Sequence, residues 1–277
     1  MNDGFFKSAK SVLAYDGKAA IVKVSGSKGS TPGKKGHVML IRENGMTIGT
    51  VGGGRLEVHC VEAGKKVIAE RKGFKEALKL DVKGEFDLEM ACSGEIELEY
   101  EFFENSKGDV EKLKVFVGAD LPSPRLIIIG AGHVSQSLGP IMKAAGFEIA
   151  IADDRPEFAN HEVHPEASEC IVTEYASIGK VMKFKKDDYV AIMTQGHKGD
   201  IDALLACAGT PDLKYIGLIG SSTKVTLAFS KLREAGIPED KINSIYAPIG
   251  IKNGGRSAQE IAISIACQII GVRYGYY

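Results

Sequence analysis

The chain has 277 residues, 44% of them hydrophobic, and its 35 basic and 36 acidic side chains leave a formal net charge of −1. This length favours two domains, and so small a net charge provides no basic field for nucleic acid. We expect no membrane span and no signal peptide, because no apolar run approaches roughly 18–20 residues and the first residues lack the charged-then-apolar layout. The five scattered cysteines form no Cys-x-x-Cys pair, so we expect reduced thiols in the cytoplasm rather than disulfides or a zinc site.

Residues 1–106 are predicted to form a small α+β domain. Apolar residues recur at helical spacing in two segments and alternate with polar ones in several others. The expected helices cover 5–15 and 55–72, and the expected strands cover 18–25, 37–42, 47–51, 74–82 and 95–103.

Two glycine-rich segments of this domain are candidate anion sites. The loop 26–36 contains four glycines and three lysines, which indicates either a loop around an anion or a plain polar loop. Gly52, Gly53 and Gly54 directly precede the second helix and form a candidate anion cradle. Glu57 in the first turn either complements the helix dipole or contacts a ligand. Cys92 stands in a predicted turn, as an accessible thiol or as a small turn residue.

Residues 107–124 are predicted to be a linker. They begin with a polar segment and end in Leu-Pro-Ser-Pro, and proline on both sides of Ser123 disfavours a helix. A new hydrophobic core begins at Leu126.

Residues 125–277 alternate strand-like and helical segments, which predicts a Rossmann-like parallel sheet with helices on both faces. The expected strands cover 126–129, 147–152, 170–174, 189–194 and 215–220. The expected helices end near 145, 182, 208, 235 and 273.

The first strand, turn and helix of this domain follow the order of a dinucleotide-binding unit. Gly130 permits the tight turn, Gly132 lets a phosphate approach the backbone, and the following helix presents free N–H groups. Asp153 lies at the end of the next strand, where a carboxylate holds a ribose hydroxyl in such folds. The third glycine position is Ser135, a small residue that still allows helix and strand to pack. The alternative is a glycine turn beside an empty crevice.

Three glycine-containing turns follow strands of this sheet, at 130–133, 195–200 and 220–224. The carboxyl ends of parallel strands meet at one edge, so these turns should border one crevice. His133 and His197 either line that crevice or are surface residues.

Several motifs resemble the xanthine dehydrogenase accessory proteins, the XdhC/CoxI family, and the resemblance spans nearly the whole chain. They are GSTP (29–32), GTVGGGRLE (49–57), Cys92 before Gly94-Glu95, GAGHV (130–134), DDR (153–155), TQGHKGD (194–200), YIGLIGS (215–221), PIG (248–250) and EIAISI (260–265). Gly33 stands where the family has an arginine, and the residues after Gly250 also depart from the family pattern.

The resemblance implies a cytoplasmic maturation factor for molybdenum hydroxylases, without turnover chemistry, catalytic residues or metal ligands of its own. Such a protein binds the molybdenum cofactor, shields it during sulfuration and delivers it to the apoenzyme. The implied partners are that apoenzyme, a cysteine desulfurase and a second copy of the chain.

The cofactor-binding residues implied by the resemblance lie in both domains. In the crevice we expect Gly130, Ala131, Gly132, His133, Val134, Asp153, Asp154, Arg155, Gln195, Gly196, His197, Gly220, Ser221 and Ser222. Toward the metal end we expect Gly52, Gly53, Gly54, Glu57 and Cys92.

Two other functions fit the residues. An NAD(P)-dependent oxidoreductase would use the same βαβ unit, although the chain has no Tyr-x-x-x-Lys pair that could carry out the reaction. A pure interaction protein would use the glycine turns for structure alone.

Overall fold

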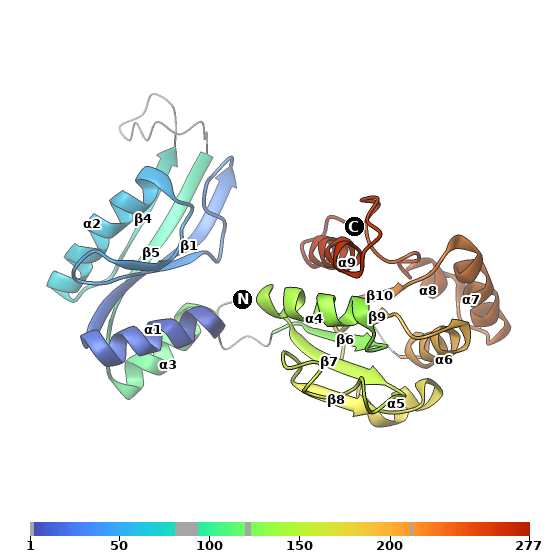
Figure 1. Cartoon of the computed structure of the whole chain (residues 1–277). Coiled ribbons are helices and arrows are strands. Elements are labelled where there is room, and N and C mark those ends of the chain that lie inside the picture. The colour runs from blue at the N-terminus through green and yellow to red at the C-terminus, as the bar shows by residue number, and fades with distance from the viewer. Residues whose placement is uncertain (1–2, 81–93, 120–122, 211–212) are drawn as a thin grey trace. The chain divides into compact units, whose positions relative to one another are not determined.

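The computed structural model describes residues 3–80, 94–119, 123–210 and 213–277. The chain divides into two compact units, Met1–Pro122 and Ser123–Tyr277 (Figure 1). Each unit has its own hydrophobic clusters, so each is described by itself.

The first unit is an antiparallel sheet covered by helices on both faces. Its strand order is β3-β2-β1-β5-β4. One face packs on α2 (Gly54–Glu70) through residues such as Leu56 and Val67, and the other packs on α1 (Asp3–Asp16) and α3 (Lys107–Phe116). The strands are β1 (Lys18–Gly29), β2 (Val38–Ile41), β3 (Thr47–Gly49), β4 (Phe74–Leu80) and β5 (Gly94–Glu104).

Two segments of the first unit differ from the sequence expectation. Strand β1 continues to Gly29, through the start of the expected loop 26–36, because its glycine-rich end pairs with β5 from Gly26↔Glu97 to Gly29↔Gly94. Part of the expected linker 107–124 is helix α3, whose Leu113 is fully buried against this unit. Ser106 caps α3 by accepting a hydrogen bond from the Asp109 N–H at 3.1 Å.

The second unit confirms the predicted Rossmann-like architecture. Its five described strands are all parallel, in the order β10-β9-β6-β7-β8. Helices α4 (His133–Ala144) and α9 (Ala258–Arg273) lie together on one face of the sheet (Figure 1). The other face is covered by η1 (Tyr175–Ser177), α5 (Ile178–Val181), α6 (His197–Ala208), α7 (Ser222–Glu234) and α8 (Glu239–Asn243).

The strand order reverses between β6 (Arg125–Ile129) and β9 (Tyr189–Ile192). From β6 the chain passes through α4 to β7 (Glu148–Asp153), and later reaches β8 (Glu169–Val172). From β9 it passes through α6, on the opposite face, to β10 (Tyr215–Leu218). The carboxyl ends of β6 and β9 therefore flank the topological switch point, where open α/β sheets bind ligands.

Candidate functional site

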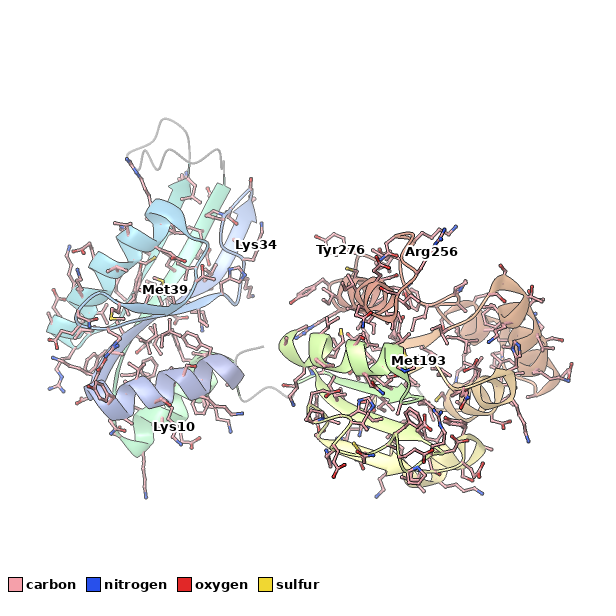
Figure 2. All side chains as sticks on the ribbon, in the orientation of Figure 1. Lys10, Lys34, Met39, Met193, Arg256 and Tyr276 are labelled. Atoms are coloured by element: carbon pink, nitrogen blue, oxygen red, sulfur yellow. The ribbon has the colours of Figure 1, made fainter. Side chains whose placement is uncertain are left out.

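The glycine turn after β6 lies directly against the end of β9. Gly130 has φ of 102°, and a Cβ there would overlap the carbonyl group of Met193. Figure 2 labels Met193 at this end of the sheet. Glycine is therefore required at 130 both by its backbone conformation and by the close approach of a neighbouring chain segment.

The next glycine of the turn faces open space. Gly132 has φ of −76°, and no heavy atom lies within 4 Å of the position that a Cβ would take. Helix α4 begins at His133, and no side chain caps it. The first N–H groups of a helix have no partner within it, and they carry a partial positive charge. This arrangement suits an anion such as a phosphate.

Buried polar side chains contact the backbone carbonyl groups of this turn. The Ser135 hydroxyl is fully buried and donates to the Gly130 carbonyl. A ring nitrogen of buried His164 lies 3.4 Å from the Ala131 carbonyl, and the other ring nitrogen lies 3.2 Å from Glu166. These contacts fix the backbone of the turn without covering Gly132.

Asp153 is fully buried, and its two oxygens accept hydrogen bonds from the protein itself. They accept from the Ala131 N–H at 2.7 Å, from the Arg155 N–H at 3.0 Å and from the Arg155 guanidinium at 2.8 and 2.9 Å. Burial alone would raise the pKa of Asp153, but these hydrogen bonds together lower it. The neighbouring Asp154, also expected in the crevice, reaches solvent, with 39% of its side chain exposed.

Arg155 connects two of the motif segments. Besides pairing with Asp153, its guanidinium donates to the Gln195 Oε1 at 2.8 Å and lies 4.0 Å from the ring centre of Phe158. Gln195 follows β9, so this bond ties the end of β7 to the end of β9. The sequence motifs DDR and TQGHKGD therefore meet at the carboxyl edge of the sheet.

The turn after β9 also leads into an uncapped helix. Gly196 has φ of 103°, has no heavy atom within 4 Å of the place that a Cβ would occupy and precedes α6 without a side-chain cap. The helix begins at His197, within the expected turn 195–200. Asp200 in its first turn accepts hydrogen bonds from the N–H and hydroxyl of Thr194. His133 and His197 are both exposed first residues of helices that flank the switch point.

The third glycine turn differs from these two. Ser221 caps α7 by accepting from the Lys224 N–H at 3.5 Å. Gly220 and Ser222 lie beyond β10, which is separated from β6 by β9. This turn therefore stands farther from the switch point and has one of its N–H groups already paired.

In the first unit, the backbone N–H groups around the glycine run 52–54 are bonded to the side chain of Glu57. Glu57 Oε1 accepts from the Val51 N–H at 3.1 Å and the Gly53 N–H at 3.0 Å, and also from the Thr50 hydroxyl. Burial works to raise the pKa of Glu57, but these hydrogen bonds bring it below its ordinary value. The expected cradle thus already holds an anion, the Glu57 carboxylate.

The two glycine motifs of this unit pack backbone to backbone. A Cβ on Gly52 would overlap Pro32 and Gly33, and a Cβ on Gly33 would overlap the Val51 carbonyl. The family's arginine is therefore replaced by glycine at a position that has no room for a side chain here. Cys92 lies outside the described residues, so its contact with the cofactor stays a prediction.

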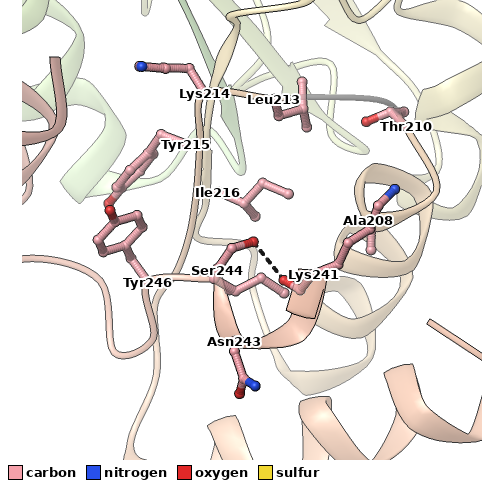
Figure 3. A pocket seen from close by; sticks show the side chains of 11 residues that line it. Ala208, Thr210, Leu213, Lys214, Tyr215, Ile216, Lys241, Asn243, Ser244 and Tyr246 are labelled. Carbon is pink, nitrogen blue, oxygen red and sulfur yellow. Dashed lines mark hydrogen bonds between the residues drawn. The ribbon is translucent and has the colours of Figure 1, made fainter. Parts of the chain in front are cut away.

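A cavity of about 400 Å³ lies elsewhere in the second unit (Figure 3). Its lining includes Lys214 and Tyr215 at the amino end of β10, Lys241 and Ser244 around α8, and Thr210 after α6. Ligands of open parallel sheets bind at the carboxyl ends of the strands, so this cavity is distinct from the crevice.

Sequence reasoning missed one residue beside the crevice, Tyr175 in η1. Its hydroxyl is buried and has no hydrogen-bond partner. Burial, followed by the negative charges of Asp153 and Asp154, raises the pKa of this phenol. No periodic pattern or glycine motif marks Tyr175, so only its position in the fold identifies it.

The described ranges contain neither a membrane-spanning helix nor a cluster of metal-binding side chains. No helix there is long and apolar enough to cross a membrane. Within the same ranges, no three His, Cys, Asp or Glu side chains gather in a way that could hold a metal ion.

Known proteins resemble this chain in sequence. The uncharacterized protein YqeB of Escherichia coli is 30% identical over 92% of this chain and 43% of its own length. A probable xanthine dehydrogenase subunit of Bacillus subtilis is 27% identical over 57% of this chain and 46% of its own. The molybdenum cofactor insertion chaperone PaoD of E. coli is 24% identical over 55% and 41%. The chain thus spans less than half the length of these relatives.

A solved structure shares the fold. The crystal structure of a xanthine dehydrogenase from Bacillus halodurans matches with a TM-score of 0.80 and 22% identity, over 98% of this chain and 96% of that one. At this identity the match supports the fold alone.

Family models match both units. The XdhC Rossmann domain matches residues 126–269, about half of the chain, and the XdhC and CoxI family model matches residues 12–77. The motifs that suggested a resemblance fall within these ranges, except the one at Cys92 to Glu95, and this chain belongs to the XdhC and CoxI family.

Proposed function

We propose that this protein binds the molybdenum cofactor as cargo and acts as a maturation factor for a molybdenum hydroxylase. Its family and its similarity to the insertion chaperone PaoD and to the probable xanthine dehydrogenase subunit of B. subtilis support this role. The cofactor carries a phosphate on its pterin, or a dinucleotide tail, and thus presents an anion to its carrier.

One observation supports the proposal most strongly: an open glycine turn leads into an uncapped helix at the switch point of the sheet. No atom lies within 4 Å of a Cβ position on Gly132, and α4 has no side-chain cap. We place the phosphate of the tail at the N–H groups of Gly132, His133 and Val134. The neighbouring N–H of Ala131 is already bonded to Asp153, so it shapes the turn rather than contacting the ligand.

The remaining residues have proposed roles around this anchor. Arg155, Gln195, Gly196 and His197 border the crevice from the ends of β7 and β9, and Gly220, Ser221 and Ser222 form its outer rim. Asp154 accepts a hydrogen bond from a polar group of the ligand. In the first unit, Glu57 holds the turn of Gly52, Gly53 and Gly54, and we propose that this turn and Cys92 face the metal end of the cofactor.

In this scheme the protein supplies no turnover chemistry. Its residues bind the tail, orient the cofactor and limit the access of water, while a cysteine desulfurase supplies the sulfur and the apoenzyme receives the product. A homodimer is part of the proposal.

An NAD(P)-dependent oxidoreductase is the second candidate, and the strand order of the second unit favours it, because that order is typical of dinucleotide-binding folds. The bonding of Asp153 opposes it. The carboxylate that normally holds the adenosine ribose of NAD is buried here, and it is already hydrogen-bonded to protein groups through both oxygens.

Two measurements on the purified full chain test the proposal. Under anaerobic conditions, molybdopterin should quench the intrinsic tyrosine fluorescence saturably, and the loaded protein should activate a molybdenum hydroxylase apoenzyme. Absence of binding would refute the assignment, and tight NADH binding with substrate-dependent turnover would favour the oxidoreductase.

Cys92 needs a test of its own. If its thiol contacts the cofactor near the terminal sulfur, Cys92→Ala should still bind molybdopterin but should mature the apoenzyme poorly. Normal maturation by this variant would remove Cys92 from the site.

A further inference from the structure

The Tyr175 hydroxyl is a buried donor without an acceptor. The side chain is 6% exposed, and the hydroxyl has no hydrogen-bond partner. A buried polar group left unpaired lowers the stability of the fold, so such groups call for an explanation. Removing the hydroxyl would avoid this cost, which makes a phenylalanine the better residue if the fold were the only consideration.

The hydroxyl lies next to the crevice. The Tyr175 ring packs against Gly199 in the first turn of α6, where a Cβ would overlap it. The phenol lies close to Asp154 without forming a hydrogen bond of normal geometry, and it interacts with the charges of Asp153 and Arg155. Asp153 ends β7, Asp154 and Arg155 follow it, and Tyr175 follows β8, so Tyr175 lies beside the ends of two strands and the first turn of α6.

The charges around it favour a neutral polar group over a second phosphate. Arg155 is already paired with Asp153 and bonded to Gln195. Asp154 has a partly exposed carboxylate that would repel an anion. A ligand hydroxyl can satisfy both neighbours, because its oxygen accepts a hydrogen bond from the phenol while its O–H donates a hydrogen bond to the Asp154 carboxylate.

We propose that Tyr175 is a ligand-contact residue of this crevice, where its hydroxyl donates to a ribose hydroxyl that in turn donates to Asp154. The site then accepts a ribonucleotide, with the phosphate at the start of α4 and the ribose between Tyr175 and Asp154. This inference rests on the proposed function for the place of the phosphate. It deepens that function, because it selects a cofactor with a nucleotide tail over one that ends in a simple phosphate.

The test is calorimetric titration of the full chain with ADP, GDP, CDP and inorganic pyrophosphate. At least one nucleoside diphosphate should bind more tightly than pyrophosphate. Tyr175→Phe should weaken that nucleotide about 3- to 10-fold, the effect of one lost neutral hydrogen bond, and should leave pyrophosphate unchanged. Tyr189→Phe is the matched control, because it removes a buried tyrosine hydroxyl at the amino end of β9, and it should change neither affinity.

A second variant guards against misfolding of Tyr175→Phe. Asp154→Asn changes a partly exposed side chain; it should weaken binding of the same nucleotide and should not weaken binding of pyrophosphate, because it only removes a repelling charge. The inference is wrong if no nucleoside diphosphate binds more tightly than pyrophosphate, or if folded Tyr175→Phe binds the nucleotide as the wild type does.

The outcomes separate this inference from the proposed function. If molybdopterin binds but Tyr175→Phe loses no nucleotide affinity, the ribose contact fails and the carrier role stands. If the nucleotide effect is seen without any molybdopterin binding, the ribose contact stands and the carrier role fails.

Discussion

At the scale of single residues, Glu57 shows how a side chain can fill a site that glycines alone suggest is empty. Its carboxylate accepts from two backbone N–H groups and a hydroxyl of the turn before α2. Glu57→Ala should lower the stability of the first unit by about 1–2 kcal/mol, because those donors lose their acceptor. Urea unfolding followed by circular dichroism measures this loss, and an unchanged midpoint would show that water replaces the carboxylate without cost.

The same carboxylate predicts a pH dependence. Its pKa is lower in the folded protein than its ordinary value, so the unfolded chain takes up a proton at higher pH than the folded one does. The stabilisation is therefore present above the ordinary glutamate pKa and is lost as the pH falls through the folded pKa. Between about pH 5 and pH 3, the thermal midpoint of the wild type should fall more than that of Glu57→Gln. Parallel curves for the two proteins would contradict this interpretation.

Arg155 provides a second test at this scale. It is paired with a carboxylate that is fully buried, and removal of one partner of a buried pair leaves an uncompensated charge. Arg155→Ala should cost about 3 kcal/mol of stability. Arg233→Ala is the control: it breaks an exposed pair with Glu239 and should lower stability much less, because solvent screens that pair. Equal losses in urea unfolding would show that the Asp153 pairing is not structural.

At the scale of elements, the two glycines of the β6–α4 turn should respond differently to substitution. Gly130 has a positive φ and no room for a Cβ, whereas Gly132 has an ordinary φ and open space. Gly130→Ala should therefore destabilise the second unit by about 2–3 kcal/mol, and Gly132→Val by about 1 kcal/mol or less. Thermal melts of both variants check this order, and a reversed order would mean that the turn is built differently.

The strands of the second unit and its helices other than α8 were predictable, because each is a local pattern. An apolar run of a few residues followed by a glycine turn marks the strands β6, β9 and β10, and periodic apolar residues mark α4 and α9. Partners far along the chain are not visible in such patterns. Strand β1 continues through glycines because β5 pairs with them, and α3 forms where a linker was expected because Leu113 finds a buried site.

The same limit applies to the candidate site. Sequence motifs found the turns that border the crevice, including the residues of the DDR and TQGHKGD segments that meet through Arg155 and Gln195. They did not show that Asp153 is hydrogen-bonded to protein groups or that Glu57 accepts from the N–H groups of the turn before α2. They also did not show that the buried Tyr175 hydroxyl has no hydrogen-bond partner. Each of these depends on a hydrogen bond made, or missing, in three dimensions.

At the scale of the whole molecule, each of the two units has its own hydrophobic clusters. The described clusters of the second unit draw all their residues from 126–272, and those of the first unit from 5–119. Residues 123–277 should therefore fold alone, with a cooperative thermal transition close to one of those seen in the full chain. A fragment without a cooperative transition would show that the second unit depends on the first.

The most direct test of the account is the molybdopterin affinity of the full chain with Gly132→Val, beside the wild type and Gly108→Val. Gly108 also stands in the first turn of a helix with open space around it, but this helix, α3, belongs to the first unit and carries none of the residues proposed to bind the phosphate. Anaerobic titration should show that Gly132→Val loses binding by a factor of about 10 or more, because its side chain blocks the approach of the phosphate to the helix N-terminus. Gly108→Val should bind as the wild type does. If Gly132→Val binds molybdopterin with wild-type affinity, the phosphate is not held at this turn and the central claim is wrong.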